Sequence, residues 1–171
     1  MRKFILISLY SVAVLLFISC KKTEGFNSLT DNQPSVAVNV SNAFDYLPAP
    51  TVLSSKAQNK ITITLQLPDN TGGRTIKEIN KIAASTTANY SAIFNGTVVG
   101  TSTSQLWSNT VIPVNATSYT FNTTIDEYKT KTGTTATPAS NAFLGRDFYF
   151  LLTLDDGSQI IPRNTRVWVV D

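Results

Sequence analysis

The segment KITITLQL, residues 60–67, decides the fold class of this 171-residue chain. Isoleucine or leucine occupies every second position, which places the apolar side chains on one face of a strand and threonine or glutamine on the other. The cluster PDNTGG that follows, residues 68–73, is rich in residues that favour turns. The sequence therefore predicts a half-buried β-strand that ends at a tight turn.

Similar patterns recur on both sides of this segment. Alternating or aromatic-rich runs predict further strands at residues 35–40, 118–122, 147–154, 158–161 and 165–170. Asn95-Gly96 lies between two further candidate strands, 90–94 and 97–100, and predicts a two-residue hairpin, since both turn positions need a positive φ. Asp155-Asp156-Gly157 predicts another turn. The frequent threonine residues suit strands better than helices.

Two segments do not show simple alternation. Ile76, Ile79 and Ile82 are spaced by three, which fits a turn of helix, but their β-branched neighbours favour a strand. Residues 124–129 predict a short helix with Thr123 or Thr124 as N-cap, acidic residues in its first turn and Gly133 beyond its end. Together these signals predict an all-β, antiparallel, immunoglobulin-like β-sandwich with one short helix over residues 35–171.

The first 19 residues have the organisation of a secretory signal peptide. Arg2 and Lys3 precede an almost unbroken apolar run over residues 4–18, and the small residue Ser19 ends it. About 15 residues at ~1.5 Å per residue span about 22 Å, less than the ~30 Å core of a bilayer. The run is therefore expected to be cleaved. Residues 20–34 are polar and contain glycine and proline, which predicts a flexible linker.

The end of this run resembles the lipobox of bacterial lipoproteins. Leu16-Phe17-Ile18-Ser19-Cys20 presents an apolar stretch and a small residue before a cysteine, although Phe17 stands where leucine is usual. The resemblance implies cleavage before Cys20 and acylation of that residue. Two or more acyl chains hold a protein firmly on a bilayer. The expected partner is thus a membrane, reached through lipid on Cys20.

The composition excludes several functions. Histidine is absent and Cys20 is the one cysteine, so Ser-His-Asp and Cys-His catalysis and the common zinc signatures are ruled out. Without Arg2 and Lys3, 12 basic residues stand against 11 acidic residues, and no basic stripe indicates binding to nucleic acid. We expect no enzymatic activity, no cofactor and no metal.

Three further stretches give the family resemblance. TTIDEYKTKTG (123–133), LGRDFYFLLTLDDGSQIIP (144–162) and VWVVD (167–171), together with the lipobox, resemble surface lipoproteins of Bacteroidota. The stretches are similar to the immunoglobulin-like domains in lipoproteins of glycan-uptake loci, including those of the starch-utilisation system E type. The resemblance implies an outer-membrane location, at the cell surface or on the periplasmic face, and a binding or scaffold role.

Aromatic residues are the best candidates for ligand contacts, because a sugar ring stacks on an exposed aromatic face. Trp107, Trp168, Tyr90 and Tyr128 are the candidates. Trp107 lies in the polar stretch 101–110, which predicts a loop or an edge. Trp168 faces away from Val167 and Val169 in its strand, and the alternation leaves both a core position and an exposed platform open.

Three acidic clusters could be read as functional sites, but each fits local structure better. Asp155-Asp156 and Asp69-Asn70-Thr71 offer too few oxygens for calcium and suit turns. Asp126 and Glu127 suit the first turn of a helix better than a glycosidase pair. The expected function is that of a non-enzymatic surface lipoprotein, a binding or assembly module whose partners are other outer-membrane proteins or a glycan. Direct carbohydrate binding is the first alternative, and a carboxylate-only hydrolase is a remote one.

Overall fold

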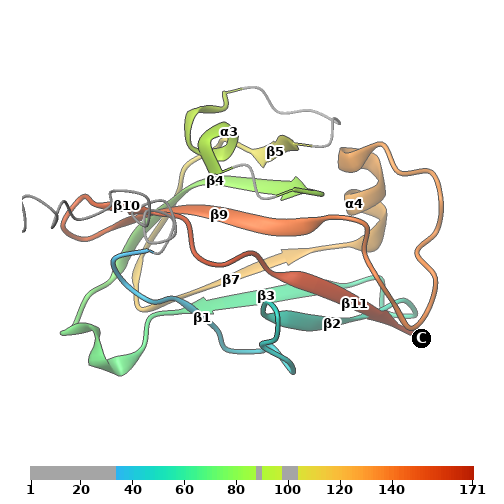
Figure 1. The fold of residues 1–171 in the computed structure, drawn as a ribbon, viewed down its shortest axis with the longest axis horizontal. Helices are drawn as coiled ribbons and strands as arrows, with labels where there is room; N and C mark the ends of the chain where they lie inside the picture. Colours follow the sequence, from blue (N-terminus) through green and yellow to red (C-terminus); the bar gives the residue numbers. More distant parts are fainter. Residues whose placement is uncertain (1–33, 88–89, 98–103) are drawn as a thin grey trace, which may run out of the picture. The chain divides into compact units, whose positions relative to one another are not determined.

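The computed structural model describes residues 34–87, 90–97 and 104–171. The predicted signal peptide, Cys20 and the linker up to residue 33 lie outside this part of the chain. Its architecture is an all-β sandwich, as predicted (Figure 1). The strands are β1 (Asn39–Val40), β2 (Thr51–Ser55), β3 (Ile61–Gln66), β4 (Ile76–Ser85), β5 (Ser104–Ser108), β6 (Ile112–Ala116), β7 (Ser118–Thr123), β8 (Ala142–Phe143), β9 (Asp147–Leu154), β10 (Gln159–Ile160) and β11 (Arg166–Val170). The helices are η2 (Asp69–Thr71), α3 (Tyr90–Asn95) and α4 (Ile125–Thr132).

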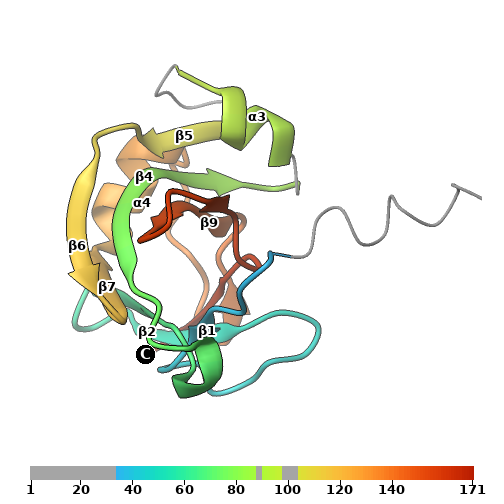
Figure 2. The ribbon, with the colours of Figure 1, turned by 90° about the vertical axis from the view of Figure 1, so that its left-hand side faces the viewer.

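Three groups of hydrogen-bonded strands form the sandwich. One has the order β1-β3-β7, the second has the order β10-β9-β4-β5 with β6 also on β4, and the third has the order β2-β11-β8. The pairs are antiparallel except for β2 and β11, which run parallel. Seen from one end, the strands surround a shared interior (Figure 2). Helix α3 lies on the outer side of β4 and β5, and α4 crosses one end of the sandwich (Figure 1).

The segment that predicts the fold becomes β3. Its four alternating apolar residues are all at most 1% exposed, and they face the main core. The register pairs Ile63 with Phe121 and Leu65 with Tyr119 of β7, so that aromatic and β-branched or aliphatic side chains face each other across the strands. The opposite face is polar, and Thr64 and Thr120 pair there through their hydroxyl groups at 3.2 Å. The prediction from residues 60–67 is confirmed.

Strand β9 has both faces covered, which explains its continuous apolar sequence. Phe148, Phe150 and Leu152 point into the main core, while Tyr149 packs on the other side with Ile93 of α3. A strand buried on both faces loses the alternation that marks a half-exposed strand. The predicted bounds 147–154 agree with the observed ones.

Strand β4 resolves the ambiguity of the three isoleucines. Ile76, Ile79 and Ile82 all lie in the core, opposite Leu154, Leu152 and Phe150 of β9. Three residues of β4 therefore match two residues of β9, because the register shifts between Ile76 and Glu78 and again between Ile79 and Lys81. Each β-bulge adds one residue and returns the next isoleucine to the same face. The favoured prediction of a strand is confirmed.

The predicted helix at residues 124–129 is α4, and its caps are those that the sequence indicates. The Thr124 side chain accepts a hydrogen bond from the Glu127 amide at 2.9 Å, and Thr123 Oγ1 donates to the Glu127 carboxylate at 2.8 Å. Gly133 ends the helix with φ 66°, a conformation that favours glycine. Satisfied end groups fix both the start and the end of this short helix.

The predicted hairpin at Asn95-Gly96 is wrong, because residues 90–95 form α3. The Gly96 amide donates to the Ala92 carbonyl at 2.7 Å, which continues helical hydrogen bonding. A Cβ at Gly96 would lie 2.3 Å from that carbonyl oxygen, so the glycine permits close approach of the backbone. The partner segment 97–100 lies largely outside the described residues.

The first predicted strand is also shorter than expected. Of residues 35–40, Asn39–Val40 alone are assigned to a strand, β1, and they pair with β3. Val36 and Val38 still pack against the core, so the alternating burial persists without ladder hydrogen bonds.

We predict that Thr124→Ala lowers the free energy of unfolding by about 1 kcal/mol, because the Glu127 amide loses its capping oxygen. Urea denaturation monitored by circular dichroism measures the change. Thr130→Ala is the matched control, since Thr130 lies inside the same helix and caps no amide. Equal losses in the two variants would contradict the capping role.

Candidate functional site

Trp107 is part of the main core. It lies in β5, the last strand in the order β10-β9-β4-β5, so the predicted edge is confirmed. The residue is nevertheless 5% exposed, which excludes an exposed ring at this position. Its ring packs on those of Phe121, Tyr128 and Phe148, with centroids 5.4–6.4 Å apart. Because the ring is enclosed, it offers no face on which a ligand could stack. The buried Tyr128 ring is excluded for the same reason.

Tyr90 is half-buried at the start of α3. Its ring meets that of Tyr149 edge to face, with centroids 6.1 Å apart. The contact belongs to a small cluster that fixes α3 on the outer face of β4 and β9. Tyr90 thus attaches α3 to the strand group that contains β4, β5 and β9. Trp168 belongs to a different strand group, that of β2, β11 and β8.

Trp168 is the candidate that reaches the surface. Val167 and Val169 are buried, while Arg166, Trp168 and Val170 alternate with them on the outward face of β11. The register places Trp168 between Leu53 of β2 and Phe143 of β8. Leu53 and Phe143 are 50% and 45% exposed. Three neighbouring strands therefore carry an outward row of apolar side chains, in which Leu53 and Phe143 are exposed and Trp168 between them is half-buried.

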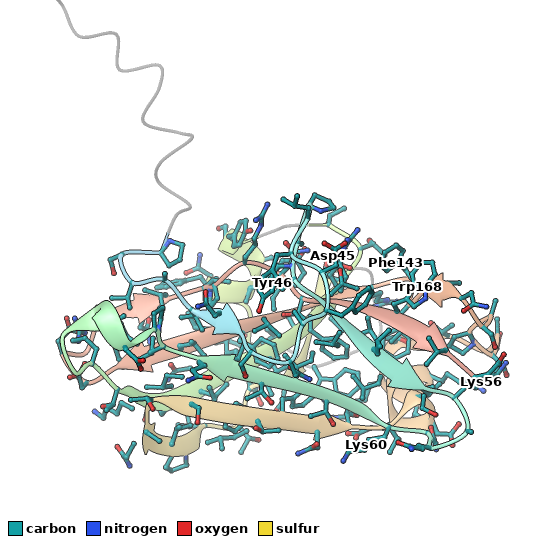
Figure 3. All side chains as sticks on the ribbon, turned by 90° about the horizontal axis from the view of Figure 1, so that it is seen from below. Asp45, Tyr46, Lys56, Lys60, Phe143 and Trp168 are labelled. Atoms are coloured by element: carbon teal, nitrogen blue, oxygen red, sulfur yellow. The ribbon has the colours of Figure 1, made fainter. Side chains whose placement is uncertain are left out.

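Close contacts hold this row in one arrangement. The Phe143 and Trp168 rings meet at 82° with centroids 4.7 Å apart. Both side chains are labelled in Figure 3. The Arg166 guanidinium lies 4.4 Å from the centroid of the Phe143 ring. Edge-to-face packing and the cation–π contact each stabilise such a pair by roughly 0.5–1.5 kcal/mol.

Arg166 also joins the row to the loop before β2. Its Nη2 donates to the Leu47 carbonyl at 3.1 Å and to Thr51 Oγ1 at 3.0 Å. Leu47 itself is 76% exposed. The outward side chains of Leu47, Leu53, Phe143, Arg166 and Trp168 form what we call the Trp168 surface.

Asp147 is a half-buried carboxylate that feels the charge of Arg166. Burial raises the pKa of Asp147 above its ordinary value, while a hydrogen bond from Asn164 at 2.7 Å and the charge of Arg166 oppose the rise. Asp147 begins β9, and Asn164 lies in the segment that leads into β11. The Asp147–Asn164 hydrogen bond thus helps to fix the start of the strand that carries Trp168.

The acidic pair Asp155-Asp156 has a structural partner in Arg74. Asp155 and Asp156 lie in the turn that joins β9 to β10. The Arg74 guanidinium forms ion pairs with both, with Nε 2.6 Å from Asp155 Oδ1 and Nη2 2.6 Å from Asp156 Oδ1. The hydrogen bond from Arg74 lowers the pKa of Asp155, and hydrogen bonds from Ser158 lower that of Asp156. No cluster of three or more His, Cys, Asp or Glu that could hold a metal occurs within residues 34–87, 90–97 and 104–171.

The adjacent carboxylates of α4 also have local roles. Asp126 accepts a hydrogen bond from the Asn59 side chain at 2.6 Å, and Glu127 takes part in the helix cap. The first contact ties α4 to the β2–β3 turn. Both residues therefore support the fold.

Of the five residues of the Trp168 surface, the sequence predicts Trp168 alone as a ligand contact. Leu47, Leu53, Phe143 and Arg166 carry no motif, and Phe143 meets Trp168 only through a pairing of two segments that are far apart in the chain. One signal was present in β11, where Arg166 shares the face of Trp168 by alternation and indicates that this face is outward.

Comparison of the chain with protein-family models, curated proteins and solved structures gave no match. Among the helices of the described residues, none has the length and hydrophobicity that crossing a membrane requires.

We predict that Asp147 makes stability depend on pH. A carboxyl with a raised pKa binds its proton more tightly in the folded protein than in the unfolded chain, so folding is disfavoured as the pH rises from 3.8 through the raised pKa. The free energy of unfolding of the wild type, relative to Asp147→Asn, should fall across that window, by about 1.4 kcal/mol for each unit of pKa shift. Urea denaturation from about pH 3 to about pH 7 measures this.

Asp155→Asn provides the control of opposite sign. The lowered pKa of Asp155 means that its contribution to stability is present at neutral pH and is lost as the pH falls through the folded pKa. A difference between wild type and Asp147→Asn that stays constant, or rises with pH, would contradict the account of Asp147.

Proposed function

We propose that this chain is a lipid-anchored, non-enzymatic lipoprotein of the bacterial outer membrane that acts as a binding or assembly module. In this proposal the acylated Cys20 holds the protein on the membrane, residues 21–34 form the linker, and the sandwich carries the binding surface. The signal-peptide pattern and the lipobox-like segment support the anchor. The resemblance to immunoglobulin-like domains of Bacteroidota surface lipoproteins supports the module.

The Trp168 surface is the observation that carries the binding role. Single exposed apolar side chains are common, but a contiguous row held in fixed geometry indicates an interaction site. Tryptophan, phenylalanine and arginine are enriched at the centres of such interfaces. The row lies on hydrogen-bonded strands, so little side-chain freedom remains to be lost when a partner binds.

Direct carbohydrate binding is the second candidate, and the exposed side of Trp168 is what favours it. A sugar needs an aromatic face, and two rings form a longer platform when they are coplanar. The 82° angle between Phe143 and Trp168 prevents a shared platform, and Arg166 lies over the Phe143 ring. The geometry therefore favours an apolar partner surface over a glycan.

A non-enzymatic role agrees with the state of the carboxylates. Asp126, Asp155 and Asp156 are engaged in hydrogen bonds or ion pairs that stabilise turns and a helix end. The chain also contains no histidine for proton transfer near neutral pH.

The anchor is tested by Cys20→Ala in a bacterial host that processes lipoproteins. We expect the wild type to incorporate labelled palmitate and to sediment with membranes, because acyl chains on Cys20 hold it there. The variant should incorporate no label and lose its membrane association. Protease treatment of intact cells then reports which membrane face the sandwich occupies.

Ser19→Ala is the matched control, since it retains a small residue before Cys20 and should leave labelling unchanged. Membrane association that persists in unlabelled Cys20→Ala would contradict the lipid anchor.

A further inference from the structure

We propose that the Trp168 surface docks on the lipid bilayer that carries the anchor, with its apolar side chains at the level of the lipid headgroups. This inference rests on the proposed function, because the anchor brings the bilayer within reach. The proposed binding partner of the Trp168 surface is the membrane itself, in preference to a protein or a sugar.

The length of chain before the sandwich keeps the domain near the anchor. Pro34 lies 14 positions after Cys20, and an extended chain of that length covers at most about 50 Å. The flexible linker that the sequence predicts has a mean reach of about 20 Å. A domain of 137 residues has a radius of gyration of about 14 Å. The sandwich and the bilayer surface are therefore held within about one domain diameter of each other.

The described chain begins on the side of the sandwich that carries the Trp168 surface. In Figure 3, the first described residues and the labelled Tyr46, Phe143 and Trp168 lie along one long margin of the molecule, with the first residues towards one end and Trp168 towards the other, whereas Lys60 lies on the opposite margin. A chain that enters from this margin can bring the same margin towards the membrane without having to pass around the domain.

The side chains on this margin match the chemistry of a membrane interface. Tryptophan and tyrosine concentrate where headgroups meet acyl chains, and leucine and phenylalanine insert slightly deeper. Tyr46 and Leu47 are 47% and 76% exposed and extend the apolar row beyond β2. The Tyr46 hydroxyl donates to the Val40 carbonyl at 2.8 Å, which fixes the loop on the sandwich.

The charges near the row favour a neutral lipid interface. Arg166 is occupied by the Leu47 carbonyl, Thr51 and the Phe143 ring, and Asp45 adds a negative charge beside Tyr46. Attraction to anionic lipid therefore contributes little, and docking should depend on apolar insertion. It should persist at high ionic strength, where screening removes surface electrostatics.

The two tryptophans allow a direct test. The lipidated wild-type protein, purified from membranes, is reconstituted into phosphatidylcholine vesicles with or without bromine on the acyl chains, and flotation confirms that it is bound. Bromine quenches tryptophan emission at short range. We expect quenching in the wild type at low and high salt, and loss of that quenching in Trp168→Phe, because Trp107 is enclosed in the core.

A second pair of variants keeps both tryptophans. Leu53→Ser should reduce the quenching, whereas Val111→Ser should leave it unchanged, since Val111 is 49% exposed but lies between β5 and β6. Circular dichroism verifies that each variant is folded.

Two results would overturn the inference, and they differ in what they leave standing. Wild-type protein that floats with vesicles but shows no Trp168-dependent quenching overturns membrane docking, keeps the anchor, and leaves the Trp168 surface to a protein or glycan. Wild-type protein that does not float overturns the anchor and, with it, the docking.

Discussion

The rings packed around Phe148 are the contact on which the rest of the structure depends. Phe148 is completely buried and meets Trp107 of β5, Phe121 of β7 and Tyr128 of α4, with centroids 5.4–6.1 Å apart. These contacts join two of the three strand groups, the one with β5 and β9 and the one with β7, to the helix α4. The same residue also exchanges two backbone hydrogen bonds of 2.8 Å with Thr165, immediately before β11. The aromatic core therefore fixes the start of the strand whose outward face carries Trp168.

The two tryptophans lie in different environments. Trp107 is enclosed with aromatic neighbours, and the Lys131 ammonium lies 5.3 Å from the centroid of its ring. Trp168 lies on the outward side of β11, where the pleat directs alternate residues away from the buried valines. Because the buried face of β11 packs on the core, its outward apolar side chains are already ordered. Little conformational entropy would then be lost when a partner binds. The proposed anchor supplies the membrane that this row would meet.

The sequence predicts most of the fold because most of its signals are local. The alternation of residues 60–67, the long apolar strand at 147–154 and the capped helix after Thr124 each follow from neighbouring residues, and each is confirmed. The predicted hairpin at Asn95-Gly96 is wrong because the glycine permits close approach to Ala92. The local sequence around a glycine with this role does not differ from that of a hairpin turn. The edge position of Trp107 follows from its polar neighbours, but the burial of its ring does not, because β5 is covered on both faces, with Leu106 towards α3 and Trp107 towards the core. Phe143 could not be found, since its place beside Trp168 depends on long-range pairing.

Acrylamide quenching of the intrinsic fluorescence distinguishes the enclosed Trp107 from the half-buried, outward-facing Trp168. Emission from an enclosed indole is blue-shifted and protected from a water-soluble quencher, whereas emission from a solvent-facing indole is red-shifted and quenched. We predict that Trp168→Phe removes the quenchable, red-shifted component and leaves the protected emission of Trp107. A Trp168→Phe variant whose remaining emission is as red-shifted and as strongly quenched as that of the wild type would contradict it.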